Sequence, residues 1–398
     1  MPRAIVAGGG LAGIVAGIAL RKSGWRPVVY DAGGSSGGLG QDHFLVLAVN
    51  GFDALAAINA ETPVKRLGFP TTRTCYTSGT GKELGVAPSA PPLDSGRGAR
   101  ALRGPELYRA LRSLAAHRGV LIEHSKTLVH AETDNDSVVV GFSDGTTARG
   151  DILVGADGMH STVRYLIDPG APAPRATGLG YTFGVARTPG LAPDGGDLHS
   201  MWGRRGWFNY VVSPSGEVWW SAYPITRHMF PHVLDHPPST SQLKSQLIAL
   251  FDRDDGPARD IVAATEHDLS LAAQYYLPSV PTWHRDRMVI IGDAAHAVLP
   301  SAEQGVAQLA ESAVILAQCL RDIDDPTQAF RHYESARRER VEQLNVVGRM
   351  IKRQGPVARV LRDVIFPHML AKLSSPGGMD ALNWLYHHHI EWDHPINS

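Results

Sequence analysis

The stretch Ala4-Ile5-Val6-Ala7-Gly8-Gly9-Gly10-Leu11-Ala12-Gly13 decides the fold class of this chain. Its first four residues form a short apolar run, which is typical of a buried parallel strand. Gly8, Gly10 and Gly13 follow with the spacing G-x-G-x-x-G. An Ala-rich apolar segment then predicts a helix that ends near Ser23-Gly24.

A second apolar run, Pro27-Val28-Val29-Tyr30, ends at Asp31, 18 residues after Gly13. The whole pattern is therefore a strand–turn–helix–strand unit that closes on a carboxylate. Such a unit is typical of a dinucleotide site: the helix N-terminus, with Leu11 and Ala12, attracts phosphates, and Asp31 can accept hydrogen bonds from a ribose. Gly8 permits the tight turn, Gly10 leaves room for a pyrophosphate, and Gly13 lets the helix pack close to the sheet. The motif alone does not separate FAD from NAD(P).

The bulk composition narrows the class of protein. The chain has 398 residues, 43% hydrophobic and 19% charged, with a formal net charge of -1. No basic surface argues for nucleic acid, and no apolar stretch of about 18 residues argues for a membrane. The two cysteines, Cys75 and Cys319, form no metal-ligand spacing and no disulfide framework. We therefore expect a cytoplasmic protein without a bound metal.

The order of the segments predicts an α/β fold in which a Rossmann-like domain is interleaved with a β-sheet domain. Residues Val120 to Arg149 indicate four antiparallel strands, and Asn50-Gly51 indicates a turn. Residues Tyr181 to Tyr223 form a second β-rich block that holds four of the eight tryptophans. This aromatic block is either an ordinary core face or the wall of a pocket for a flat apolar substrate. We assign residues 1–70, 98–175 and 281–325 to the first domain, 71–97 and 176–280 to the β-sheet domain, and 326–398 to a C-terminal helical segment.

Two further buried strands also end in turns suited to a ligand. Ile152 to Val154 runs into Gly155-Ala156-Asp157-Gly158, and Met288 to Ile291 runs into Gly292-Asp293. A dehydrogenase that binds only NAD needs the first motif alone. A longer ligand that lies across the sheet explains the third, because the Asp293 carboxylate can hold a ribityl hydroxyl. Gln304-Gly305 then stands at a helix N-terminus, whose dipole favours negative charge.

On these motifs the chain resembles the single-component FAD-dependent aromatic hydroxylases, the class A flavoprotein monooxygenases with the para-hydroxybenzoate hydroxylase fold. The resemblance covers about Arg3 to Leu320. It implies that the ADP half of FAD contacts the Gly8–Gly13 turn and Asp31, that Arg103 lies at the phosphates, and that Asp157 belongs to a motif serving both FAD and NADPH. It further implies that Asp293, next to Gly292, binds the ribityl chain, and that Pro300, Gln304 and Gly305 flank the isoalloxazine.

The resemblance also implies a reaction. NADPH or NADH reduces FAD, O2 adds at the flavin C4a, and the hydroperoxide hydroxylates or epoxidises an aromatic or apolar small molecule, such as a natural-product intermediate. The flavin carries the chemistry, so the sequence requires no catalytic side chain. Candidate substrate contacts are His43, Trp207, Asn209 and Tyr210. A non-oxygenating flavoenzyme, a halogenase and an FAD-holding scaffold remain as alternatives.

Two histidine features invite a functional reading. His296 follows Gly292-Asp293, and we interpret it as a packed residue rather than a catalyst. His387-His388-His389 lacks an accompanying cysteine or carboxylate pattern, so we interpret it as surface rather than as a metal site. The sequence leaves the choice of NADPH or NADH, the substrate and the oligomeric state open.

Overall fold

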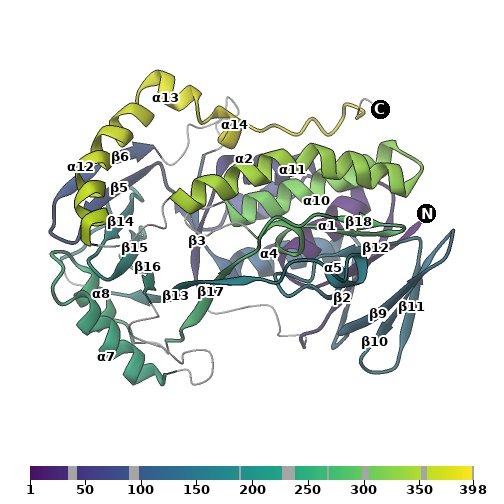
Figure 1. Cartoon of the computed structure of the whole chain (residues 1–398), viewed down its shortest axis with the longest axis horizontal. Helices are drawn as coiled ribbons and strands as arrows, with labels where there is room; N and C mark the ends of the chain where they lie inside the picture. The colour runs from purple at the N-terminus through teal and green to yellow at the C-terminus, as the bar shows by residue number, and fades with distance from the viewer. Residues whose placement is uncertain are drawn as a thin grey trace.

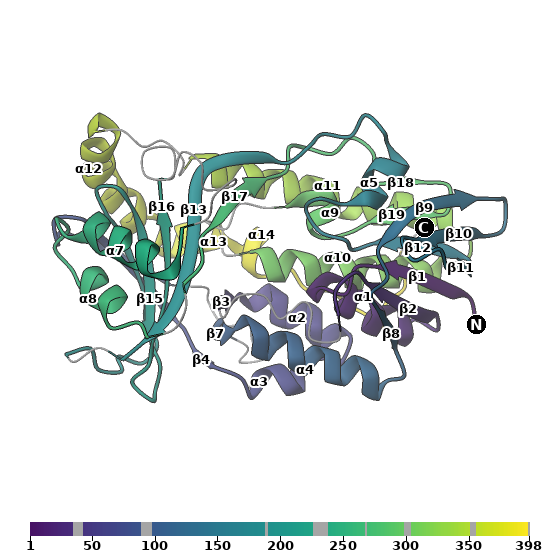
Figure 2. The same cartoon turned by 90° about the horizontal axis from the view of Figure 1, so that it is seen from below.

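The computed structural model describes residues 1–34, 43–88, 98–187, 190–225, 238–266, 269–297, 304–350 and 356–396. Two large sheets lie at opposite ends of an elongated molecule (Figures 1 and 2). One is six-stranded and begins with the N-terminal strand, and the other is seven-stranded. The fold is α/β, as predicted.

The six-stranded sheet carries the glycine turn. All of its neighbouring strands run parallel, except for the antiparallel pair at one edge formed by β18 and β19. Its strands are, in spatial order, β18 (His284–Arg285), β19 (Met288–Ile290), β12 (Ile152–Gly155), β1 (Arg3–Ala7), β2 (Arg26–Asp31) and β8 (Leu121–His124). Because β19, β12 and β1 are adjacent and parallel, the three turns that follow them meet at the same edge.

The seven-stranded sheet has two differently covered faces. Its strands are, in spatial order, β17 (Ala272–Tyr276), β13 (Arg175–Ala186), β16 (Val218–Pro224), β15 (Gly206–Val212), β14 (Leu198–Trp202), β5 (Arg73–Ser78) and β6 (Glu83–Pro88). On the outer face, Phe208 and Trp220 pack against α7 (Thr240–Phe251) and α8 (Ala258–Ala263). On the other face, which we call the inner face, Val211 and Trp219 pack against a small sheet that borders the first domain.

Two three-stranded sheets complete the β-structure. The one against the inner face consists of β3 (Phe44–Leu47), β7 (Arg100–Arg103) and β4 (Phe69–Pro70). The other, at the far end of the molecule, consists of β11 (Thr147–Gly150), β10 (Val138–Phe142) and β9 (Leu128–Thr133). Ser143-Asp144-Gly145 forms the hairpin turn between β10 and β11, in which Gly145 has φ +81° and donates to the Phe142 carbonyl.

Two helices in the described part of the chain begin at a serine whose side chain caps them. Ser161 caps α5 by accepting from the Arg164 N–H, and Ser239 and Gln242 form a capping box on α7. The long helix α10 packs against α1, α2 and α11. The remaining helices are α1 (Leu11–Lys22), α2 (Val49–Ala57), α3 (Glu61–Lys65), α4 (Gly104–His117), α5 (Thr162–Ile167), α9 (Asp293–His296), α10 (Gly305–Asp322), α11 (Pro326–Met350), α12 (Pro356–Leu373), α13 (Pro376–Asp380) and α14 (Asn383–Tyr386).

Two predictions about local structure were wrong. Asn50-Gly51 is not a turn but lies inside α2, because the buried Asn50 side chain hydrogen-bonds other helices and Gly51 allows a close approach to α10. The strand near Val120, β8, pairs parallel with β2 and not antiparallel with β9, because α4 returns the chain to the edge of the main sheet. Among the helices in the described parts of the chain, none combines the length and apolar character needed to cross a membrane.

Candidate functional site

The glycine turn between β1 and α1 has the geometry of a ligand-binding loop. Gly8 has φ +109°, and a Cβ there would lie 2.2 Å from the Ala156 carbonyl oxygen. A Cβ on Gly13 would lie 1.9 Å from the Gly8 carbonyl oxygen, so both positions exclude any side chain. A Cβ on Gly10 would meet nothing within 4 Å. Two glycines therefore serve packing, while Gly10 faces open space where a ligand can approach the main chain.

Asp31 stands at the end of β2 beside this turn. Its carboxylate accepts from the Gly33 N–H at 3.2 Å, and its Oδ2 lies 3.3 Å from His124 Nδ1. Arg112 Nη2 lies 2.7 Å from His124 Nε2. Because a guanidinium only donates, His124 Nε2 accepts this hydrogen bond, and the ring proton on Nδ1 is donated to Asp31. The acid is therefore held in a fixed orientation with acceptor capacity to spare.

A cavity of about 270 Å³ begins at the glycine turn. It is lined by Gly10, Leu11, Ala12, His43, Gly104, Tyr108, Ala156, Gly158, Asp293 and Leu309. These residues come from all three strand-end motifs and from α4 and α10. A Cβ on Gly292 would lie 3.2 Å from the Ala12 Cβ and 3.5 Å from the Leu309 Cβ, which shows how closely the first and third motifs approach.

Asp293 is the charged group of this cavity. It is the first residue of α9, and no hydrogen-bond partner for its carboxylate is found in the described part of the chain. Surrounding protein raises the pKa of the Asp293 carboxyl by desolvation. The residue is nonetheless exposed to the cavity, so water there limits that rise. An acceptor that meets no protein donor is available for a hydroxyl of a ligand.

Asp157 has one oxygen engaged and one without a partner. Its Oδ2 accepts from the Val163 N–H at 3.0 Å, in the first turn of α5. Its Oδ1 is buried and makes no hydrogen bond to the residues that the structure describes. Desolvation raises the pKa of this carboxyl. Ala156 and Gly158 on either side of Asp157 line the cavity, whereas the Asp157 Oδ1 is enclosed by protein.

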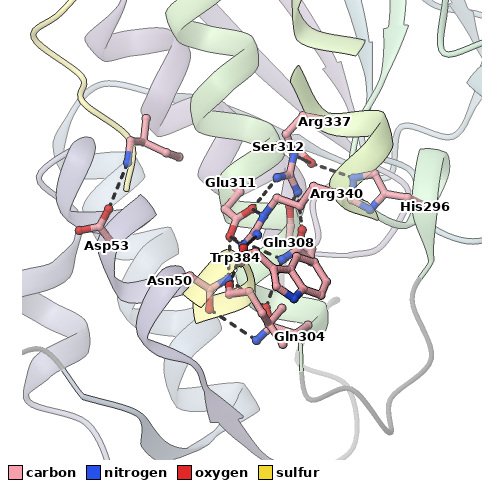
Figure 3. A network of polar contacts seen from close by, with 12 residues as sticks. Asn50, Asp53, His296, Gln304, Gln308, Glu311, Ser312, Arg337, Arg340 and Trp384 are labelled. Carbon is pink, nitrogen blue, oxygen red and sulfur yellow. Dashed lines mark hydrogen bonds and ion pairs between the residues drawn. The ribbon is translucent and has the colours of Figure 1, made fainter. Parts of the chain in front are cut away.

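The predicted residues at the α10 end differ in their placement. Gly305 is exposed at the start of α10, whereas the Gln304 side chain is fully buried and points into a polar network with Asn50 and Gln308 (Figure 3). Only the main chain near Gln304 is left to face a ligand. Pro300 lies outside the described residues.

Arg103 and His43 lie at the entrance to α4. Arg103 occupies the N-cap position of α4 and pairs with Phe44 in the small sheet, and it is not among the residues that line the cavity. His43 does line the cavity, and its ring lies 5.3 Å from the ring of Phe183 on β13. A Cβ on Gly104 would lie 2.3 Å from His43 Cε1, so Gly104 makes room for that ring. His43 therefore connects the cavity with the seven-stranded sheet.

The three substrate candidates on β15 divide between the two faces of the sheet. Trp207 and Asn209 alternate with Val211 and point to the inner face, whereas Tyr210 packs in the core under α7 and α8. The prediction that Tyr210 lines a pocket with them was therefore wrong. Adjacent side chains on a strand point to opposite faces, so Asn209 and Tyr210 do not line the same pocket. The Asn209 Oδ1 is buried, and no described residue hydrogen-bonds it.

The histidines behave as structural groups. His296 is buried, its Nε2 lies 2.7 Å from Ser312 Oγ, and burial lowers its pKa to about 3, so it is neutral. His387 and His388 are half-buried rather than on the surface, because the C-terminal segment folds back over α2 and α10. His389 contacts Asp53 at 2.8 Å. No group of three or more candidate metal ligands occurs among the described residues.

All three strand-end motifs contribute residues to one cavity, with the Asp293 carboxylate in it and Asp31 beside the glycine turn, and this arrangement is that of a dinucleotide-binding fold. The family model described as "FAD binding domain" matches residues 2–346. The chain belongs to this family and is a class A FAD-dependent monooxygenase with FAD as its cofactor. The use of NAD(P)H is typical of the family.

Curated relatives of similar length support this assignment. The FAD-dependent urate hydroxylase of Klebsiella pneumoniae subsp. pneumoniae is 27% identical over 352 residues, which cover 86% of this chain and 87% of the relative. The 3-amino-4-hydroxybenzoate 2-monooxygenase of Streptomyces platensis is 28% identical over 366 residues, 86% of each chain. The 6-hydroxynicotinate 3-monooxygenase of Bordetella bronchiseptica is 27% identical over 359 residues, 87% of this chain and 90% of that one.

A solved structure shares the fold closely. Klebsiella pneumoniae HpxO complexed with FAD and uric acid has a TM-score of 0.83 and 23% sequence identity, covering 96% of this chain and 97% of that chain. The residues present here fit FAD, because the open side of Gly10 and the unpartnered Asp293 carboxylate lie in one cavity.

Two residues near the site, Tyr108 and Asn50, were not predicted from the sequence. Tyr108 lines the cavity and donates to the Gly9 carbonyl oxygen at 2.8 Å. It lies one turn into α4, after Arg103, which was expected at the phosphates, and this position could have indicated a place in the site. Asn50 was concealed because Asn-Gly is usually a turn signal.

Proposed function

We propose that this monooxygenase oxygenates an aromatic small molecule bound between the inner face and the cofactor cavity, with NADPH or NADH as reductant and O2 as co-substrate. The observation that carries the proposal is His43, which lines the cavity and contacts Phe183 of the seven-stranded sheet. FAD supplies the oxygen-transfer chemistry when bound. The chain's own residues have to hold the substrate beside it and exclude water.

The inner face alternates apolar, polar and aromatic rows, which supports an aromatic substrate that also carries a polar group. Cross-strand pairing aligns Ser200, Asn209 and Ser221 in one row across β14, β15 and β16. The row on one side holds Leu198, Val211 and Trp219, and the row on the other holds Trp202, Trp207 and Tyr223. A flat ring can lie against the aromatic row while the amide of Asn209 meets a donor or acceptor of the substrate.

In detail, we propose that the ADP half of FAD contacts Gly8, Gly10, Leu11, Ala12, Gly13 and Asp31, and that Arg103 lies toward the phosphates. We further propose that Asp157 belongs to a motif serving both FAD and NADPH, and that Gly292 and Asp293 hold the ribityl chain. Pro300, Gln304 and Gly305 would flank the ring. We also propose the domain limits given above. In their support, each strand of the two large sheets falls within one domain, except that β13 begins one residue early, at Arg175. Two cysteines without a disulfide suit the cytoplasm.

A screen of aromatic compounds, monitored by NAD(P)H oxidation and peroxide release, identifies the substrate. With a substrate in hand, we expect Asn209→Leu to raise KM about 5- to 10-fold, the value of one lost hydrogen bond. Tyr210→Phe is the matched control, because this side chain lies on the opposite face of the same strand. If Tyr210→Phe raised KM as much as Asn209→Leu did, the substrate would not lie on the inner face.

A further inference from the structure

Helix α10 carries a stripe of polar side chains on a fully buried side. Gln304, Gln308, Glu311 and Ser312 recur at the spacing of one helix face, and each is at most 1% exposed. An inward helix face is normally apolar, and a buried polar group is costly unless it is hydrogen-bonded. Figure 3 shows that these groups are joined in one network with side chains from α2 and α11.

Glu311 is the centre of this network. Its carboxylate accepts from Arg337 Nη1 at 2.5 Å, and from Arg340 Nε and Nη2 at 2.8 Å each. Burial alone would raise the pKa of Glu311, but the two guanidinium groups outweigh burial and lower this pKa to about 2. Arg340 also donates to the carbonyl oxygens of Trp384 and Leu385, so the cluster clamps the C-terminal segment as well.

Asn50 connects the ion cluster with the start of α10. Its Nδ2 donates to Glu311 Oε1 at 2.6 Å and to Gln304 Oε1 at 2.9 Å. The neighbouring Gly51 makes this reach possible, since a Cβ there would lie 3.0 Å from the Ala307 Cα. Gln304, the residue before the first turn of α10, is therefore held from inside the protein, and its side chain makes no capping hydrogen bond to the helix.

Helix α10 borders the cofactor cavity through Leu309, one turn after its start. Leu309 lines the cavity, and Gly305 lies four residues earlier on the same helix face. A Cβ on Gly305 would meet nothing within 4 Å, so the helix start is open on that side. Main-chain N–H groups in the first turn of a helix have no partner within the helix. Their direction depends on how firmly the chain at Gln304 is fixed.

We propose that Asn50 and Glu311 are positioning residues for FAD: through Gln304 they fix the N-terminal turn of α10 against the cofactor. The proposal rests on the FAD site and is independent of the substrate's identity. A buried ion cluster is in itself weak evidence for stability, because desolvation offsets much of the attraction between the charges. A role in fixing one local arrangement explains why the polar chain ends at Gln304, the N-cap of the helix whose Leu309 lines the cavity.

The test is FAD binding by Asn50→Leu, a substitution of similar size that keeps Glu311 and both arginines. We expect the Kd for FAD, measured by titrating the apo-protein, to rise about 10-fold or more, as is typical when a residue that orients a ligand-binding group is removed. The visible absorption spectrum of the bound flavin should shift as well. The matched control is Asp53→Asn on the same helix, which weakens contacts to His389 and to the Ile390 N–H but not the chain to Gln304.

An unchanged FAD affinity and flavin spectrum in Asn50→Leu, together with a less stable apo-protein, would overturn the proposal and leave the network a purely structural role. So would an equal loss of affinity in Asp53→Asn, which would indicate general loosening. If Asn50→Leu does not fold, Gln304→Met cuts the same chain at its other end and leaves the ion cluster intact. It should weaken FAD binding to a similar degree, and unchanged binding in that variant would also refute the role.

Discussion

Asp293→Ala should weaken FAD binding without weakening the apo-protein. The Asp293 carboxylate faces the cavity and accepts no hydrogen bond from the described residues, so its partner is expected to be a ribityl hydroxyl of FAD. A hydrogen bond to a charged group contributes about 1.5–3 kcal/mol. Its loss should therefore raise the Kd for FAD roughly 10- to 150-fold.

The stability of the apo-protein should not fall when the Asp293 carboxylate is removed. Desolvation raises the pKa of Asp293 above its ordinary value, so the folded protein disfavours the charged carboxylate relative to the unfolded chain. Its presence therefore costs stability near neutral pH, and this cost fades as pH falls through the raised pKa toward about 4, the ordinary pKa of an aspartate, below which it is absent. The Asp293→Asn variant should be at least as stable as the wild type at pH 7, with the difference vanishing in acid.

FAD titration of the apo-protein and denaturant unfolding at two pH values measure both quantities. The competing explanation is that Asp293 caps the turn before Ala294, in which case its loss would cost about 1 kcal/mol of apo-protein stability. An unchanged FAD affinity combined with a destabilised apo-protein would refute the assignment of Asp293 to the cofactor.

Three further outcomes are expected. Gly10→Ala should fold normally but bind FAD more weakly, because its Cβ would meet no protein atom and would occupy the space open to the ligand. Gly13→Ala should instead lower apo-protein stability, because its Cβ would lie 1.9 Å from the Gly8 carbonyl oxygen. Unfolding curves and FAD titration distinguish the two variants. Burial lowers the pKa of His296 to about 3, so between about pH 6.5 and pH 3 the unfolded chain binds a proton that the folded protein does not bind. The unfolding free energy should therefore fall by up to ~1.4 kcal/mol for each unit by which the pH is lowered in that range. His296→Gln should flatten that slope in unfolding experiments. Glu311→Gln leaves two buried arginines without a counter-charge and should cost about 3–5 kcal/mol in unfolding free energy, and a smaller loss than 1 kcal/mol would contradict the central place of Glu311.

The glycine turn and the two Asp-containing turns were predictable because their constraints are local. Gly8 has φ +109°, and a side chain on Gly13 would meet the Gly8 carbonyl oxygen five residues earlier, so the G-x-G-x-x-G spacing records both requirements. The same holds for Ser161 and Ser239 as helix caps. The aromatic block likewise formed the predicted sheet, since alternating apolar residues specify strands without reference to distant partners.

The features that escaped prediction depend on tertiary contacts. Asn50 was interpreted as a turn residue because its partners, Gln304 and Glu311, lie more than 250 residues away in the sequence. The parallel pairing of β8 with β2 depends on where α4 returns the chain, which strand propensity does not encode. The face of Tyr210 follows from register, which becomes clear only when its neighbours Phe208 and Val212 are seen packed under α7.

Turnover under 18O2 shows whether this FAD-dependent monooxygenase inserts oxygen into its substrate. With a substrate from the screen, we expect one 18O atom in each product molecule and one NAD(P)H consumed for it, by a protein that holds one FAD per chain. Product that forms without incorporating 18O from 18O2, while NAD(P)H consumption still depends on the substrate, would contradict oxygen insertion.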